Sequence, residues 1–113
     1  MRFRFRHRLR TLMIAVVVGG LVLGGEVMRR RALSYQVLAS THRDEAQMHR
    51  ESAEIASVEA EDLRQRGSHD GMALWSERAR DNARRAAYHA ALARKYEQAA
   101  RSPWLPVAPD PPP

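Results

Sequence analysis

Residues 1–31 read MRFRFRHRLRTLMIAVVVGGLVLGGEVMRRR, and this stretch decides where the rest of the chain lies. Five arginines and no acidic residue occupy the first ten positions, and residues 11–25 carry no charge. A basic end followed directly by an uncharged apolar run is typical of a membrane-targeting segment. The sequence therefore predicts a basic cytoplasmic end at residues 1–10 and a transmembrane helix at residues 11–28.

The apolar run is compatible with an uncleaved transmembrane anchor or with a cleaved signal peptide. As a helix, residues 11–25 are about 22 Å long, whereas the hydrocarbon core of a bilayer is about 30 Å thick. Extension to residues 9–28 reaches about 30 Å and includes Arg10 and Glu26 near its two ends. The alternative is a signal peptide that is cleaved near Gly25. The arginines at 29–31 resemble the far flank of an anchor and favour the uncleaved form.

The flanking charges predict the orientation of the span. More arginines precede it than follow it, so the positive-inside tendency keeps the N-terminus in the cytoplasm and exports residues 29–113. We therefore expect a protein of the inner cell membrane whose first partner is membrane lipid. Gly20 and Gly24 form a G-x-x-x-G pattern that lets two membrane helices approach closely, which predicts helix–helix contact between two spans.

The net charge of +6 does not indicate nucleic-acid binding once it is divided along the chain. The first ten residues hold five of the 19 basic residues and none of the 13 acidic ones. The remainder is nearly neutral with mixed signs, a poor match to a surface that follows phosphates. We expect no nucleic-acid partner.

Residues 29–66 predict a first helix with a regular apolar face. Alanines recur every seven residues, and a second set follows each alanine by three, which is the spacing of a helix that packs on another helix. We call these positions the first seam: Ala32, Ala39, Ala46, Ala53 and Ala60, with Tyr35, His42, His49, Ala56 and Leu63. The pattern Thr41-x-x-Asp44 also matches a capping box, which allows the helix to restart near Thr41.

Residues 67–71 predict a turn, because Gly67 suits the left-handed position after a helix end and Ser68 or Asp70 can cap the next helix. Residues 72–101 predict a second helix with its own seam. This second seam is Met72, Ala79, Ala86, Ala93 and Ala100, with Ser76, Ala83, Ala90 and Glu97, flanked by Trp75, Tyr88, Leu92 and Tyr96. The fold class is all-α: one transmembrane helix, then an alanine-seamed α-hairpin or coiled coil. Pairing within one chain and pairing between two chains remain open.

Residues 102–113 predict an extended, proline-rich tail. Pro103, Pro106, Pro109 and Pro112 recur every third residue, which places them on one edge of a polyproline II helix. One interpretation is a tail that contacts a partner protein through Pro103, Trp104 and Pro106, with Leu105 beside them. The other is a helix stop followed by a stiff, disordered end.

The chain offers few residues for catalysis or cofactor binding. It has no cysteine, and no glycine-rich phosphate loop follows a strand pattern. His42 and His49 lie about 10.5 Å apart on one helix, too far to share a metal ion. Glu45 with either histidine could supply two ligands, completed only by a symmetry mate, and His89 is expected on the helix surface. We therefore expect no enzyme activity, no cofactor, no metal site and no small-molecule substrate.

Two ends of the chain carry a resemblance to a known group. Residues 8–18 read RLRTLMIAVVV, residues 88–100 read YHAALARKYEQAA, and residues 103–112 read PWLPVAPDPP. These segments resemble short, uncharacterised bacterial single-pass membrane proteins with a basic N-terminus, one span, a charged helical region and a KYE…PW…PDPP tail. The resemblance implies membrane placement and no particular activity.

These patterns predict a non-enzymatic, single-pass membrane protein with an exported helical region. We expect it to act as a scaffold or to contact a partner at the cell envelope, by self-association or through an envelope protein. The alternative is a secreted helical binding protein, released by cleavage near Gly25.

Overall fold

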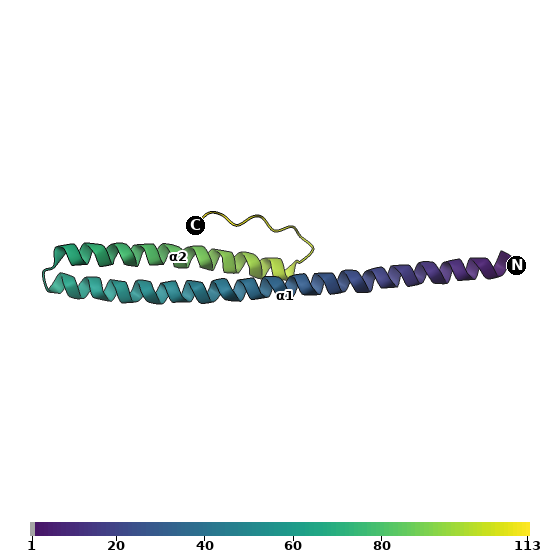
Figure 1. The fold of residues 1–113 in the computed structure, drawn as a ribbon, viewed down its shortest axis with the longest axis horizontal. Helices are drawn as coiled ribbons and strands as arrows, with labels where there is room; N and C mark the ends of the chain where they lie inside the picture. The colour runs from purple at the N-terminus through teal and green to yellow at the C-terminus, as the bar shows by residue number, and fades with distance from the viewer. Residues whose placement is uncertain (1) are drawn as a thin grey trace.

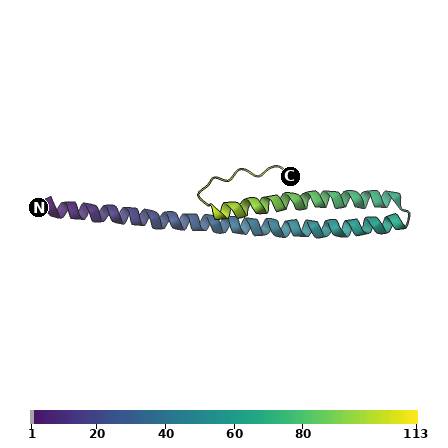
Figure 2. The same cartoon turned by 180° about the vertical axis from the view of Figure 1, so that it is seen from behind.

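The structure, a computed structural model, describes residues 2–113, which form two helices and no strand. Helix α1 spans Arg2–Gln65 and helix α2 spans His69–Arg101. Figures 1 and 2 show α2 folded back along the second half of α1, while the first half of α1 stands alone. The molecule is accordingly a rod, with extents of 99 × 19 × 12 Å. The expected all-α fold class is confirmed for the described residues.

Helix α1 continues without a break from the basic end through the apolar run into the charged half. The restart near Thr41 that the capping pattern allowed is therefore wrong. The Thr41 hydroxyl donates back to the Val37 carbonyl at 3.0 Å, and the Ser40 hydroxyl donates to the same carbonyl at 2.9 Å. Such back-bonding satisfies these side chains within the helix, so they do not cap a new one.

Gly67 ends α1 in the left-handed conformation, with φ of +79°. The Ser68 amide donates to the Leu63 carbonyl at 3.0 Å, and the Gly67 amide donates to the Arg64 carbonyl at 3.1 Å. These two bonds make a Schellman motif, which satisfies carbonyls that a helix end otherwise leaves free.

Helix α2 begins earlier than the expected residue 72, at His69. The reason is that the Ser68 carbonyl already accepts the Met72 amide at 3.0 Å. Ser68 occupies the N-cap position, although its side chain makes no capping hydrogen bond.

The surface between α1 and α2 is built mainly from alanine. The buried apolar residues of the described chain are Ala39, Ala46, Ala56, Ala60, Ala86, Leu92, Ala93 and Ala99, of which Ala99 also lines the groove beside the tail. Ala83, expected on the second seam, is exposed instead. Small side chains bury little apolar area, so this pairing of helices is only modestly stabilised by the hydrophobic effect.

Candidate functional site

The apolar run lies on the half of α1 that α2 does not cover (Figure 1). Its large side chains are open to solvent, with Leu21 72% and Val22 65% exposed. This stretch is long and apolar enough to cross a membrane, and it lies near the N-terminus. A Cβ added at Gly20 or Gly24 would meet no neighbouring atom within 4 Å. The G-x-x-x-G surface is therefore open along its length.

Glu26 is neutralised where the apolar run ends. Its carboxylate lies 2.9 Å from the Arg29 guanidinium and 2.8 Å from that of Arg30. Both partners lie one turn further along the same helix, which is the spacing at which side chains meet. The first charges after the run therefore form a local ion-pair group and not an isolated carboxylate.

A ladder of aromatic rings connects α1 and α2, and its members alternate between the two helices. Tyr96 of α2 stacks on Tyr35 and His42 of α1, and His89 of α2 stacks on His42 and His49 of α1, with ring centroids 5.4–6.1 Å apart. Each step of seven residues along α1 is matched by seven residues back along α2. We call these five residues the ring ladder.

The ladder continues one step toward the turn as a polar pair. The His49 Nδ1 atom lies 3.3 Å from the Asn82 amide oxygen, and Asn82 is seven residues before His89. At the other end, Arg43 pairs with Glu97 across the helices. The polar groups of this interface thus hold α1 and α2 in one register, which alanine packing alone would specify weakly.

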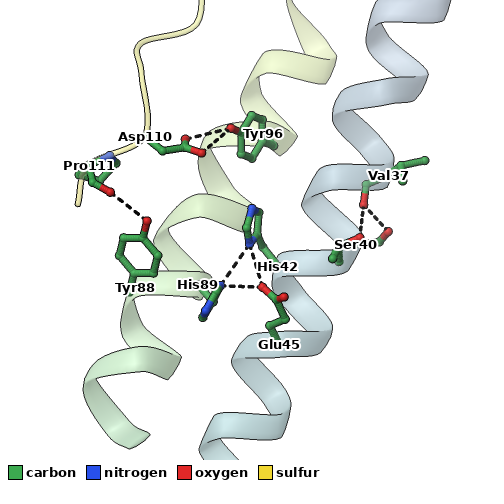
Figure 3. A network of polar contacts seen from close by, with 10 residues as sticks. Val37, Ser40, His42, Glu45, Tyr88, His89, Tyr96, Asp110 and Pro111 are labelled. Carbon is green, nitrogen blue, oxygen red and sulfur yellow. Dashed lines mark hydrogen bonds and ion pairs between the residues drawn. The ribbon is translucent and has the colours of Figure 1, made fainter. Parts of the chain in front are cut away.

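Three potential ligand atoms meet at the middle of the ladder (Figure 3). The His42 Nδ1 atom lies 3.1 Å from the Glu45 Oε2 atom and 3.1 Å from the His89 Nδ1 atom. The His89 Nδ1 atom lies 2.8 Å from the same carboxylate oxygen. The His42 and His89 side chains are only 18% and 20% exposed, and that of Glu45 is 40% exposed. We call these three residues the His–Glu–His cluster.

The C-terminal tail returns along α2 and is fastened there by Asp110 (Figure 3). The Asp110 carboxylate lies 2.6 Å from the Lys95 ammonium and accepts a hydrogen bond from the Tyr96 hydroxyl at 2.8 Å. One residue on, the Pro111 carbonyl accepts the Tyr88 hydroxyl at 2.9 Å. We call this set of contacts the tail clamp.

The clamp shifts the pKa of two of its members. The Lys95 hydrogen bond, followed by that from Tyr96, holds the pKa of the Asp110 carboxyl below its usual range. Partial burial, followed by the bond to Asp110, raises the pKa of the Tyr96 hydroxyl. Both shifts keep the clamp in its bonded form near neutral pH, with Asp110 charged and Tyr96 protonated.

The predicted partner-contact residues of the tail lie in different surroundings. Pro103 is buried at the end of α2, whereas Pro106 is exposed and Trp104 is 65% exposed. A groove of about 490 Å³ lies between the tail and the last turns of α2, lined by Leu105, Pro106 and Val107 among others.

Two contacts escaped the sequence analysis. His89 was expected on the helix surface but lies between the helices, and Asp110 was not considered as a tether. Both depend on residues at least 14 positions away. One sequence pattern could have placed His89 between the helices. Polar and aromatic residues recur every seven positions on both helices, and in an antiparallel hairpin the two series run in opposite directions. The series are Tyr35, His42 and His49 on α1, and Tyr96, His89 and Asn82 on α2.

Comparisons with known proteins supply no further identification: no protein-family model, no curated protein and no solved structure matches this chain.

Proposed function

We propose that this protein is a non-enzymatic, single-pass membrane protein whose helical hairpin and tail are exported and serve partner contact or scaffolding at the cell envelope. One observation carries the proposal. The apolar part of α1 is the part that α2 leaves uncovered, and the ring ladder begins at Tyr35, just beyond the arginines at 29–31.

The exposed apolar side chains support a lipid environment. Monomeric soluble proteins rarely expose a continuous apolar patch larger than a few hundred Å², and such a patch marks an interaction surface. Here the patch surrounds a helix on all sides, since Leu12, Ile14, Val17, Leu21 and Leu23 are all more than half exposed. A helix that is apolar all round requires a surrounding apolar medium.

The ends of the run support a spanning arrangement. A helix satisfies its own backbone hydrogen bonds, which hydrocarbon requires. Glu26 meets Arg29 and Arg30 at the distal end, so no charge there enters the lipid unpaired. At the proximal end, Arg10 can extend to the headgroups. The arginine excess before the span favours a cytoplasmic N-terminus and an exported hairpin.

Self-association through the span is the contact that we propose for Gly20 and Gly24. Both glycines have open space around them, so a second helix could approach closely there. Trp104 and Pro106 present a second contact surface on the tail, held in place by the tail clamp. The resemblance of the two ends of the chain to single-pass membrane proteins agrees with this arrangement.

The test of membrane placement is the intact mass of the native protein in membranes washed at alkaline pH. Full-length mass in the pellet is the expected result, because an integral helix resists extraction. A mass lacking about the first 25 residues, recovered in the soluble fraction, would instead identify the secreted form that signal cleavage produces.

The orientation can be tested separately because the chain has no cysteine. We expect a membrane-impermeant thiol reagent, applied to intact cells with a permeable outer layer, to label S57C and not R6C. Both positions are exposed in the structure, so the labelling difference reports sidedness. The reverse pattern would refute the exported hairpin.

A further inference from the structure

We propose that His42, Glu45 and His89 form a binding site for a divalent zinc ion between α1 and α2. This inference does not depend on membrane placement, because the cluster lies wholly within the paired helices. It replaces the sequence-based expectation of no metal site, which placed His89 on the helix surface and not beside His42 and Glu45.

The first argument is that the three atoms converge on one point. The Glu45 oxygen and the two Nδ1 atoms lie pairwise 2.8–3.1 Å apart. An ionised carboxylate only accepts hydrogen bonds, and each neutral imidazole carries a single N–H group. If both Nδ1 atoms carried their proton, two donors would face each other at 3.1 Å.

The other proton arrangement also leaves a conflict. If only one Nδ1 atom carries its proton, the lone pair of the other Nδ1 atom faces the Glu45 carboxylate oxygen at 2.8–3.1 Å. Two acceptors then face each other without a proton between them. Protons alone therefore cannot satisfy all three contacts of two neutral rings and a carboxylate. One cation bound by all three atoms removes every conflict.

The second argument is that the ligand set and the spacing suit zinc. Tetrahedral Zn²⁺ binds nitrogen and oxygen ligands at about 2.0–2.2 Å, which places the ligands about 3.3 Å from one another. The observed separations need to open by only a few tenths of an ångström. Two histidines and one glutamate leave a fourth position for water, a known arrangement for zinc, and imidazole ligands disfavour Mg²⁺ and Ca²⁺.

The third argument is that the rings are held in place. His42 stacks on Tyr96 with an interplanar angle of 12°, and His89 stacks on His49 with an angle of 15°. His42 and Glu45 are three residues apart on one helix, where side chains are neighbours. The side chains of both histidines are mostly shielded from solvent. Few water molecules would therefore have to leave these two rings when a metal ion binds.

A zinc ion at this point would join the two helices nearer to the open end of the hairpin than to the Gly67 turn. Alanine side chains bury little apolar area, so packing alone stabilises the pair of helices weakly. A zinc ion that bridges α1 and α2 would stabilise the pair further. A ligand that binds only the folded form raises stability in proportion to the logarithm of its concentration over the dissociation constant.

The experiment uses the full-length chain in detergent micelles, without a histidine tag and stripped with a chelator. Zinc chloride is titrated against a competing chromogenic indicator near neutral pH. We expect one zinc ion per chain and a rise in the unfolding temperature that magnesium chloride does not produce. Acidification should weaken binding, because imidazole must be neutral to bind a metal.

Variants assign the site to its residues. Because loss of a partner outside the ligand set already costs ~10–100-fold in affinity, H42A, H89A and E45Q should each weaken zinc binding at least about tenfold. H7A and H69A, which remove exposed histidines, should bind zinc as the wild type does. E45Q keeps both imidazole rings and nearly the shape of the Glu45 side chain. It therefore tests the carboxylate as a zinc ligand in a folded hairpin, and circular dichroism verifies that the helix content is unchanged.

Two results would overturn the proposal. One is zinc binding by the H42A/H89A double variant with wild-type affinity, which would place the ion elsewhere. The other is the absence of wild-type binding at micromolar zinc in protein whose helix content is intact. In that case a proton shared within the cluster, and not a metal ion, occupies the meeting point.

Discussion

Leu92 is the largest of the buried apolar residues, at 3% exposed. We expect L92A to destabilise the hairpin by about 2–3 kcal/mol, because it removes buried methyl groups and leaves a cavity among alanines too small to fill it. Chemical unfolding followed by circular dichroism measures the change. The matched control L74A alters a residue that is 50% exposed and should change stability by no more than about 0.5 kcal/mol. Equal effects of the two variants would contradict the observed packing.

Gly67 is the residue whose backbone requires glycine. Its φ of +79° costs an L-residue with a Cβ about 1–2 kcal/mol, so G67A should lower hairpin stability by about that amount. G67N should cost less, since asparagine tolerates this conformation better. If G67A unfolds at the same denaturant concentration as the wild type, the left-handed turn is wrong.

Asp110 gives the tail a pH dependence with a definite sign. Its pKa is lowered in the folded protein, so the clamp contributes stability above the ordinary aspartate pKa of about 3.9 and loses it as pH falls through the lowered value. We expect the tail to stay docked from neutral pH to about pH 4 and to detach below it. Exposure of the pair to solvent keeps its contribution to stability small.

Spin labels at R84C and P113C can measure this docking, because the chain has no cysteine and both sites are exposed. The distance between the labels should lengthen and broaden below about pH 4 in the wild type. D110N should show the long distance at every pH, since it removes the charge that Lys95 meets. A distance unaffected by either change would show that apolar contacts alone hold the tail.

At the scale of the helix, the alanine positions control how closely α1 and α2 approach. Ala46 is 4% exposed, so A46L should force the helices apart and cost about 1–3 kcal/mol. Q47L places the same side chain one residue on, at an exposed position, and should leave stability nearly unchanged. Thermal unfolding of the two variants, compared with the wild type, provides the measurement.

The association that we propose for the span also belongs to the scale of the helix. Leucine at both glycines, G20L/G24L, should abolish dimers formed through the span, because the added side chains prevent close approach. V18L/V22L enlarges residues with the same spacing on the opposite face and should leave dimers intact. Crosslinking in native membranes gives the readout, and an unchanged dimer in G20L/G24L would remove this contact from the proposed function.

Periodicity predicted much of this architecture, and contacts distant in sequence account for what it missed. The seven-residue spacing of Ala39, Ala46 and Ala60 identified the face that is now buried, because helical geometry alone sets that face. It could not identify His89, since the position of one helix along another depends on pairs such as His42 with His89. The tail's three-residue period likewise predicted an extended chain but not its return to Lys95 and Tyr96.

At the scale of the whole molecule, the apolar run and the first arm of the hairpin belong to one helix. Helix α1 runs from Arg2 to Gln65 without the glycine-rich or proline-rich linker that usually separates a membrane anchor from its exported domain. The turn at Gly67, which joins α1 to α2, lies far from the apolar run. In the proposed arrangement the hairpin has no hinge at the membrane surface.

A rod without a hinge acts as a lever. Residues 32–65 extend about 50 Å along the helix axis. A change of about 10° in the tilt of the span, well within the range that membrane helices adopt, would therefore move the turn sideways by about 9 Å. Local bilayer thickness, or the crossing angle of two paired spans, would in this way set the position of the Gly67 turn relative to the membrane. The distal turn would then report mechanically on the state of the lipid around residues 11–28.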